Sequence, residues 1–244
     1  METAPVIAIK NLYKTFGTNE ILKGISLTVN KGEDLVILGR SGSGKSVTIK
    51  CLVGLVKADK GEIQIFGKET TTLNNDELNE IRVGIGFMFQ DGALYDSMSV
   101  RQNLTFALKH HTKNLSEEDI EKQILEALEN VGLSEALEKM PSELSGGMKK
   151  RIALARTIIT KPEIILYDEP TSGLDTITSN EISELILSVQ KKYNTSSIII
   201  THDMACAKIT ANRILILKDG VINAEGTYAE LEKSDDEWVR SFFI

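Results

Sequence analysis

The sequence contains a run of residues whose types and spacing could wrap a phosphate group. Residues 39–46 read Gly-Arg-Ser-Gly-Ser-Gly-Lys-Ser and fit the phosphate-loop pattern G-x-x-x-x-G-K-S/T at every required position. In this pattern the glycines let backbone N–H groups turn toward phosphate oxygens, and the following helix adds the partial positive charge of its N-terminus. Lys45 would reach the β- and γ-phosphates of a nucleotide, and Ser46 would bind Mg²⁺.

The sequence around the loop supports this interpretation. Residues 35–38 form an apolar run typical of a buried strand, and residues 47–54 predict a helix. A glycine-rich turn that matched by chance would not be expected to carry both flanking elements, so nucleotide binding is the better interpretation. The predicted contacts are Gly39, Arg40, Ser41, Gly42, Ser43, Gly44, Lys45, Ser46 and Val47.

Two carboxylates follow a second apolar run. Residues 164–167 predict a buried strand that delivers Asp168 and Glu169 to its C-terminal end. One carboxylate could hold Mg²⁺ near a γ-phosphate, and its neighbour could orient or deprotonate an attacking water. A helix-capping pair before Pro170 is the alternative, which the upstream phosphate loop disfavours.

A histidine and an aromatic residue are further candidates. His202 follows a predicted strand at residues 197–201, where it could contact a γ-phosphate and position water. Phe16 is predicted to lie, with Tyr13, in the connection between short strands at residues 6–10 and 25–29. It could stack on a nucleotide base or pack on the edge of the domain, and both interpretations stay open.

The remaining pattern predicts two α/β halves separated by helices. Residues 91–160 are expected to form an all-helical insertion between halves at residues 1–90 and 161–244, with Ser116 as an N-terminal cap. The last segment is expected to be one helix whose aromatic residues dock on the core. The expected strands are 61–66, 85–89 and a hairpin of 213–217 with 221–224; the expected helices are 76–82, 100–110, 116–131, 148–160, 175–193 and 229–243.

Composition limits the classes of function. The 244 residues carry a net charge of -7, which argues against broad binding to nucleic acid. The longest apolar runs are far shorter than a membrane span, so the chain is expected to stay in the cytosol. Cys51 and Cys206 are predicted to be buried free thiols. His110 and His111 could suggest a metal, but exposed residues at the C-terminal end of a helix are the favoured interpretation.

Taken together, these motifs resemble the nucleotide-binding subunit of an ABC transporter over essentially the whole chain. The motifs follow the order of that family. Phe16 stands at the base-stacking position, residues 39–46 form the phosphate loop, Gln90 stands at the Q-loop, and residues 144–148 (Leu-Ser-Gly-Gly-Met) match the signature. Asp168 and Glu169 come next, followed by the D-loop at residues 172–175 and by His202 at the switch position. The resemblance implies an α/β fold of the P-loop NTPase class, ABC type. Its parallel-rich core sheet would be accompanied by an antiparallel β subdomain and an inserted α-helical subdomain.

The resemblance also implies roles and partners. It assigns ATP hydrolysis to Glu169, His202, Gln90 and Lys45, with ATP and Mg²⁺ as cofactors. The metal ligands would be Ser46, Gln90 and Asp168. Two copies would pack head to tail as a homodimer, so that Ser145, Gly146 and Gly147 of one copy close over the ATP of the other. Asp175 of the D-loop is also expected to bind the nucleotide.

Two positions depart from the family pattern, and the first of them helps to identify a branch of the family that the chain resembles. The signature ends in Met148 where Gln is usual, and Gly173 stands where Ala is common. Residues 92–98, residues 140–148 and the C-terminal segment resemble the Mla-type branch, which moves phospholipids between the inner and outer membranes of Gram-negative bacteria and of plastids. That branch implies a peripheral subunit on the cytoplasmic side of the inner membrane that maintains outer-membrane lipid asymmetry. Its partners would be integral-membrane (MlaE-like) permease subunits and a substrate-binding (MlaD-like) lipid carrier, with no nucleic acid.

Other functions stay open beside this one. A small-solute importer or a lipid-linked exporter would use the same ATPase, a soluble ABC protein could act on ribosomes or DNA, and a phosphate-loop switch could bind ATP without turnover.

An apolar patch follows Gln90. Ala93, Leu94, Tyr95 and Met98 lie in a short span after Gly92. The patch could pack within the helical insertion or form part of a groove for a partner's cytoplasmic helix. We favour the groove, because the coupling helix of the family docks in this region.

Overall fold

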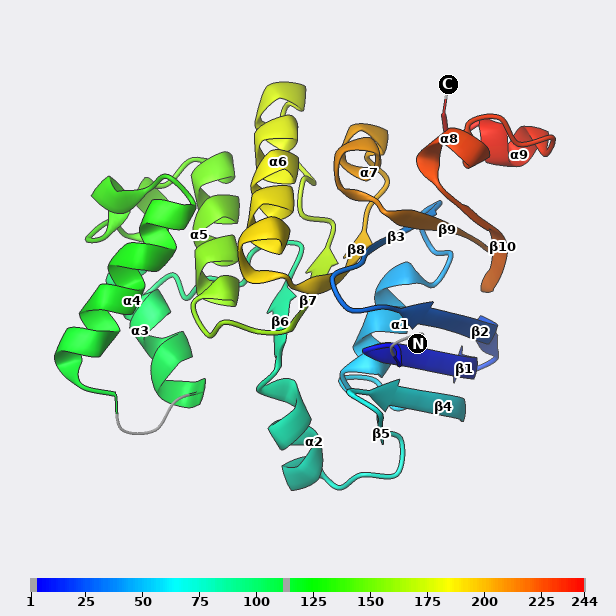
Figure 1. Ribbon diagram of the computed structural model, residues 1–244, viewed down its shortest axis with the longest axis horizontal. Helices are drawn as coiled ribbons and strands as arrows, with labels where there is room; N and C mark the ends of the chain where they lie inside the picture. The colour runs from blue at the N-terminus through cyan, green and yellow to red at the C-terminus, as the bar shows by residue number, and fades with distance from the viewer. Residues whose placement is uncertain (1–3, 112–114, 244) are drawn as a thin grey trace.

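The computed structural model describes residues 4–111 and 115–243, and Figure 1 shows their arrangement. Its centre is a six-stranded sheet in the order β10-β9-β3-β8-β7-β6, in which all neighbours pair in parallel except the β9–β10 hairpin. The strands are β3 (Asp34–Gly39), β6 (Ile85–Met88), β7 (Ile164–Asp168), β8 (Ser196–Ile200), β9 (Arg213–Lys218) and β10 (Val221–Gly226). This sheet is the parallel-rich core sheet that was expected.

The parallel strands are apolar on both faces, so the sheet has a core on each side. In β3, Val36 and Leu38 face one core, whereas Leu35 and Ile37 face the other. The first core is closed by α5 (Gly146–Ile158), α6 (Thr176–Tyr193) and α7 (Met204–Thr210). The second is closed by α1 (Lys45–Leu52) and by a separate antiparallel sheet.

That antiparallel sheet has the order β2-β1-β4-β5, from β1 (Ile7–Phe16), β2 (Asn19–Val29), β4 (Lys60–Ile65) and β5 (Lys68–Glu69). The predicted short strands at residues 6–10 and 25–29 were wrong in extent, because β1 and β2 continue to a turn at Gly17 and Thr18. Tyr13 and Phe16 therefore lie in β1. The register shifts between Ile9 and Leu12, where Asn11 adopts φ +48°, so the apolar alternation is interrupted while pairing continues.

A group of helices connects β6 to β7. It contains α3 (Val100–His111), α4 (Glu117–Asn130), the short 3₁₀ turns η1 (Ser134–Ala136) and η2 (Pro141–Glu143), and α5. Figure 1 shows α3 and α4 beyond the β6 side of the central sheet. Ser116 caps α4 as expected, since its Oγ accepts from the Asp119 N–H at 3.1 Å. The division into a core at 1–90 and 161–244 and a helical unit at 91–160 stays a prediction.

The C-terminal segment is not one helix. Residues 229–243 form two short helices, α8 (Tyr228–Leu231) and α9 (Glu237–Arg240), because Asp236 starts a new helix by accepting the Trp238 N–H at 2.8 Å. Trp238, Phe242 and Phe243 pack against the first core, as predicted.

Three smaller features complete the fold. Helix α2 (Asn75–Arg82) precedes β6 and begins with an Asn74 capping box. Cys51 and Cys206 are buried free thiols whose pKa burial raises to about 11. None of the helices in the described ranges combines the length and apolar character needed to cross a membrane.

Candidate nucleotide site

The phosphate loop joins β3 to α1, and a glycine fixes where the helix starts. Gly44 precedes α1 with φ +103°, a conformation that glycine adopts without strain. A Cβ atom at Gly44 would lie 2.7 Å from Leu22 Cδ2, so the packing of β2 against the loop also requires glycine. The loop residues Gly39, Arg40, Ser41, Gly42, Ser43, Gly44, Lys45, Ser46 and Val47 all line one cavity.

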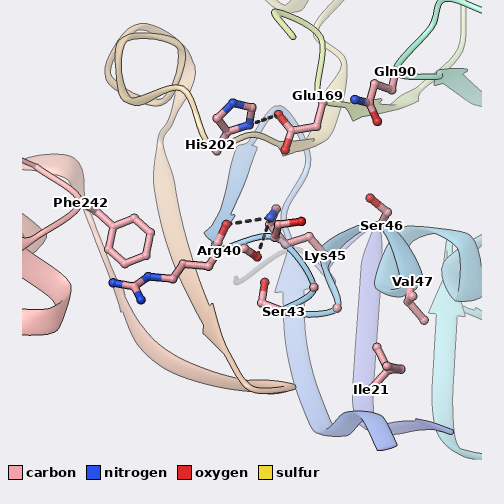
Figure 2. A pocket seen from close by; sticks show the side chains of 14 residues that line it. Ile21, Arg40, Ser43, Lys45, Ser46, Val47, Gln90, Glu169, His202 and Phe242 are labelled. Carbon is pink, nitrogen blue, oxygen red and sulfur yellow. Dashed lines mark hydrogen bonds and ion pairs between the residues drawn. The ribbon is translucent and has the colours of Figure 1, made fainter. Parts of the chain in front are cut away.

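Lys45 is a largely buried cation within this loop. Its Nζ donates to the carbonyl oxygens of Gly39 (2.7 Å) and Arg40 (3.2 Å), as Figure 2 shows. Burial lowers the pKa of the ammonium, and the carboxylates of Glu169 and Asp168 act in the opposite direction. The cation is therefore held at the floor of the cavity beside two acidic residues.

The hydroxyl of Ser46 meets the first acidic residue. Ser46 Oγ donates to Asp168 Oδ1 at 2.8 Å, and Asp168 is the last residue of β7 and 5% exposed. A hydroxyl and a carboxylate are the oxygen ligands that Mg²⁺ takes beside nucleotide phosphates, so this pair fits the metal.

Glu169 and His202 are brought together by strand register. Asp168 of β7 pairs with Ile200 of β8, so the residues that follow the two strands leave the sheet side by side. Glu169 Oε2 lies 2.7 Å from His202 Nδ1. Glu169 also adopts a left-handed backbone with φ +52°, and its N–H donates to the Ile200 carbonyl at 2.9 Å.

One cavity of about 640 Å³ unites these groups. Besides the loop residues it is lined by Gln90, Glu169 and His202, which come from the ends of β6, β7 and β8. Figure 2 shows Glu169 and His202 across the cavity from the phosphate loop. Ile21 and Phe242 also line it, and neither was predicted to do so. Phe242 was expected only on the core, and no local sequence signal places either residue at the site.

Six candidate residues are not among the described residues that line this cavity, and one of them is Asp168, which contacts the lining residue Ser46. Phe16 ends β1, is 49% exposed and lies 5.2 Å from Lys14 Nζ, measured to the ring centre. Ser145 caps α5, with Gly146 and Gly147 in its first turn. Asp175 caps α6 by accepting from the N–H groups of Ile177 (3.0 Å) and Thr178 (3.1 Å).

Sequence reasoning also missed a buried cation next to the cavity. Lys150 of α5 is 7% exposed and donates to the backbone of Gln90 and Glu169. The sequence shows it only as the second of two lysines near the start of a predicted helix.

Comparison with curated proteins gives several relatives. The chain is 39% identical to Protein TRIGALACTOSYLDIACYLGLYCEROL 3, chloroplastic, of Arabidopsis thaliana, over 97% of this chain and 73% of the relative. It is 38% identical to the probable ribonucleotide transport ATP-binding protein mkl of Mycobacterium leprae, over 99% and 70%. It is also 38% identical to the methionine import ATP-binding protein MetN of Brucella abortus, over 92% and 60%.

Solved structures agree in fold. The ATP-binding cassette MJ0796, in a dimeric post-hydrolysis state bound to ADP and Pi, superposes with a TM-score of 0.84 at 33% identity, over 91% of this chain and 98% of that one. The protein cbiO1 of Clostridium perfringens, part of the ABC transporter complex cbiONQ, superposes with a TM-score of 0.85 at 27% identity, over 99% and 100%. The ABC transporter family model matches residues 22–172, more than half of the chain. The chain therefore belongs to the ABC transporter family, and it is an ATP-binding ATPase domain of that family.

Proposed function

We propose that this ATPase energises phospholipid transport between the inner and outer membranes and so maintains outer-membrane lipid asymmetry. The observation that carries the ATPase part is the cavity that places Glu169, held by His202, opposite the phosphate loop. The lipid part is supported by Met148 in the signature and by the relative named after trigalactosyldiacylglycerol, a lipid. The subunit would lie on the cytoplasmic side of the inner membrane.

Each side chain at the cavity has a task in this proposal. The loop N–H groups and Lys45 bind the β- and γ-phosphates and stabilise the charge that develops on the transferred phosphoryl group. Glu169 orients the attacking water and accepts its proton, while His202 fixes the Glu169 carboxylate and contacts the γ-phosphate.

Ser46, Asp168 and Gln90 would hold Mg²⁺. When bound there, the metal would supply positive charge that offsets the negative charge of the nucleotide phosphates. The Ser46 hydroxyl and the Asp168 carboxylate already lie in contact, so little rearrangement is needed for both to face one ion.

The remaining candidates are assigned to the nucleotide base and to a second copy of the chain. Phe16 would stack on the base from the end of β1. Ser145, Gly146 and Gly147 form the N-terminus of α5, which suits a γ-phosphate bound by another copy, and Asp175 would lie at the same boundary. The dimeric cassette that superposes on this chain supports a homodimer.

A permease would dock in an apolar groove of about 300 Å³ where α2, β6, α3 and α5 meet. Leu55, Phe87, Phe89 and Ala107 are among its lining residues. Arg156 also lines the groove and donates to the carbonyls of Ala93 (2.5 Å) and Gly92 (2.9 Å), so the loop that leads to Tyr95 is fixed at its wall. Such a groove suits an amphipathic helix of an MlaE-like permease.

The transporter could instead import a small solute, because the Brucella relative is a methionine importer at nearly the same identity. Purification of the complex through a tag on this chain, followed by identification of the untagged membrane subunits and of bound lipid, separates the two. The proposal predicts phospholipid in excess of that bound to an unrelated membrane protein purified in parallel. A complex without excess lipid whose ATPase responds to an amino acid would contradict it.

A further inference from the structure

Lys150 has all three of its ammonium donors engaged by loops that border the nucleotide cavity. Its Nζ donates to the carbonyl oxygen of Gln90, to the carbonyl oxygen of Glu169 (3.2 Å) and to Ser172 Oγ (3.2 Å). Gln90 lies in the loop after β6, whereas Glu169 and Ser172 both lie in the loop between β7 and α6, so a single side chain of α5 joins two separate loops.

This cation is buried without a carboxylate partner. Within residues 4–111 and 115–243, Lys150 forms no ion pair, and its side chain meets neutral oxygens only. Removing a charge from water is costly unless it is paired and hydrogen-bonded, and an apolar residue would fill the same space at lower cost. Burial accordingly lowers the pKa of Lys150, opposed by Asp91, Glu169 and Asp168.

The backbone conformation of Glu169 indicates what Lys150 does. A left-handed backbone is strained for a non-glycine residue, so the φ of +52° at Glu169 must be held by its surroundings. Its N–H donates to the Ile200 carbonyl, and its own carbonyl accepts from Lys150 Nζ and from the Ser172 N–H, both at 3.2 Å, so both backbone groups are fixed. With the backbone fixed in this way, the carboxylate reaches His202.

We infer that Lys150 is a positioning residue for ATP hydrolysis. Its hydrogen bonds to the backbone of Glu169 and Gln90 connect both residues to α5, the helix that begins after Ser145. The inference rests on the proposed role of Glu169. Because the hydrogen bonds of Lys150 go to Gln90, Glu169 and Ser172 and not to the phosphate loop, it acts on the hydrolytic step rather than on nucleotide binding.

The test compares Lys150→Met with Lys149→Met in the full chain, since Lys149 is the exposed neighbour on the same helix. We expect Lys150→Met to lower kcat by about 10- to 100-fold, with KM for ATP and ADP affinity within about twofold of wild type. Lys149→Met should match wild type. Lys150→Arg, which keeps the charge and donors, should recover at least about one third of wild-type kcat.

A double-variant cycle separates positioning from a general loss of structure. If Lys150 acts through Glu169, then Lys150→Met should change single-turnover hydrolysis less than about threefold in a Glu169→Gln background. If Lys150→Met fails to fold, Ser172→Ala removes one acceptor and should lower kcat by about threefold or more at unchanged KM.

The inference is overturned if folded Lys150→Met, or Ser172→Ala in its place, keeps wild-type kcat, or if the loss appears equally in nucleotide affinity. A fully multiplicative effect with Glu169→Gln also overturns it. A Glu169→Gln variant with normal turnover would instead refute the proposed role of Glu169, so the two failures are distinct.

Discussion

At the scale of single residues, the site depends on polar groups held in conformations that cost free energy. Glu169 has a left-handed backbone, Lys45 is a buried cation, and Ser46 and Asp168 bind each other at 2.8 Å. These arrangements are stable because each group is hydrogen-bonded, and they leave Glu169 and Lys45 lining one cavity.

The role of Glu169 predicts a separation of binding from turnover. Glu169→Gln should keep ATP affinity and lower turnover by at least about 100-fold, the usual effect of losing a general base. Lys45→Ala should instead weaken nucleotide binding, because Lys45 carries the charge at the phosphate loop. Steady-state ATPase rates and fluorescent-nucleotide titrations on both variants check this, and near-normal turnover in Glu169→Gln would remove the residue from its assigned role.

Asp34 predicts a pH dependence of stability. It starts β3, its Oδ1 accepts from Ser197 Oγ at 2.5 Å, and its buried Oδ2 has no partner among the described residues. Burial raises the pKa of this carboxyl from 3.8 to about 6, with the Ser197 hydrogen bond lowering it and Glu33 raising it. The folded state therefore binds the proton more tightly than the unfolded chain does. This contribution to stability is complete below pH 3.8 and is lost as the pH rises through about 6.

Asp34→Asn removes this titration. The unfolding free energy of the variant minus that of wild type should rise by up to about 3 kcal/mol between pH 4 and pH 8. Urea unfolding of both proteins at several pH values measures the difference. A difference that stays constant over this range would show that Asp34 does not titrate there.

At the scale of elements, parallel strands explain how distant residues meet. The ends of β6, β7 and β8 share one edge of the sheet, so Gln90, Glu169 and His202 reach the same cavity. The sequence was sufficient for this part of the site because each residue directly follows an apolar run. The cap at Ser116 was predicted in a similar way, since a polar side chain precedes a helical pattern there. Asp175 was predicted as the first residue of its helix and proves to be the residue that caps it.

Other parts could not be read from local pattern. A register shift at Asn11 hid the continuation of β1, and an internal cap at Asp236 divided the last helix. Ile21, Phe242 and Lys150 reach the site only through tertiary packing of β2, of the C-terminal segment and of α5. The sequence around each of these three residues is typical of an ordinary strand, C-terminal segment or helix, so it does not indicate a site.

The apolar groove predicts a separable effect on partner binding. Tyr95 is 44% exposed and its ring packs edge to face on Phe106, with centres 5.0 Å apart, whereas Leu94 packs against the core. Tyr95→Glu should keep the melting temperature and nucleotide affinity but reduce the permease recovered with the tagged chain by about tenfold or more. Leu94→Glu should also lower the melting temperature because it introduces a charge at a packed position.

Leu125→Glu is the matched control for this experiment. Leu125 lies on α4 with the same exposure of 44%. Neither residue lines the groove itself, but Tyr95 follows the loop at Gly92 and Ala93 that the groove residue Arg156 binds. It should retain the permease. Equal recovery of permease by folded Tyr95→Glu and by wild type would count against the docking surface.

At the scale of the whole molecule, one chain holds two separate parts of the proposed site. The phosphate loop, Glu169 and His202 line the cavity, but Ser145, Gly146 and Gly147 lie at the N-terminus of α5 and are not among the residues lining it. A transition state that needs both parts would be incompletely stabilised in one copy. We therefore expect the isolated monomer to be a weak ATPase whose specific activity rises with protein concentration as dimers form.

The most direct test of a site completed by a second copy is the ATPase rate of mixed variants. Lys45→Ala disables the phosphate loop, and Ser145→Arg disables the helix terminus offered to the partner. Each variant alone should be inactive. In a mixed dimer, the intact loop of the Ser145→Arg copy faces the intact Ser145 of the Lys45→Ala copy, so we predict that mixing restores activity, up to about one half of the wild-type rate per mixed dimer. No restored activity under conditions in which mixed dimers demonstrably form would contradict the account.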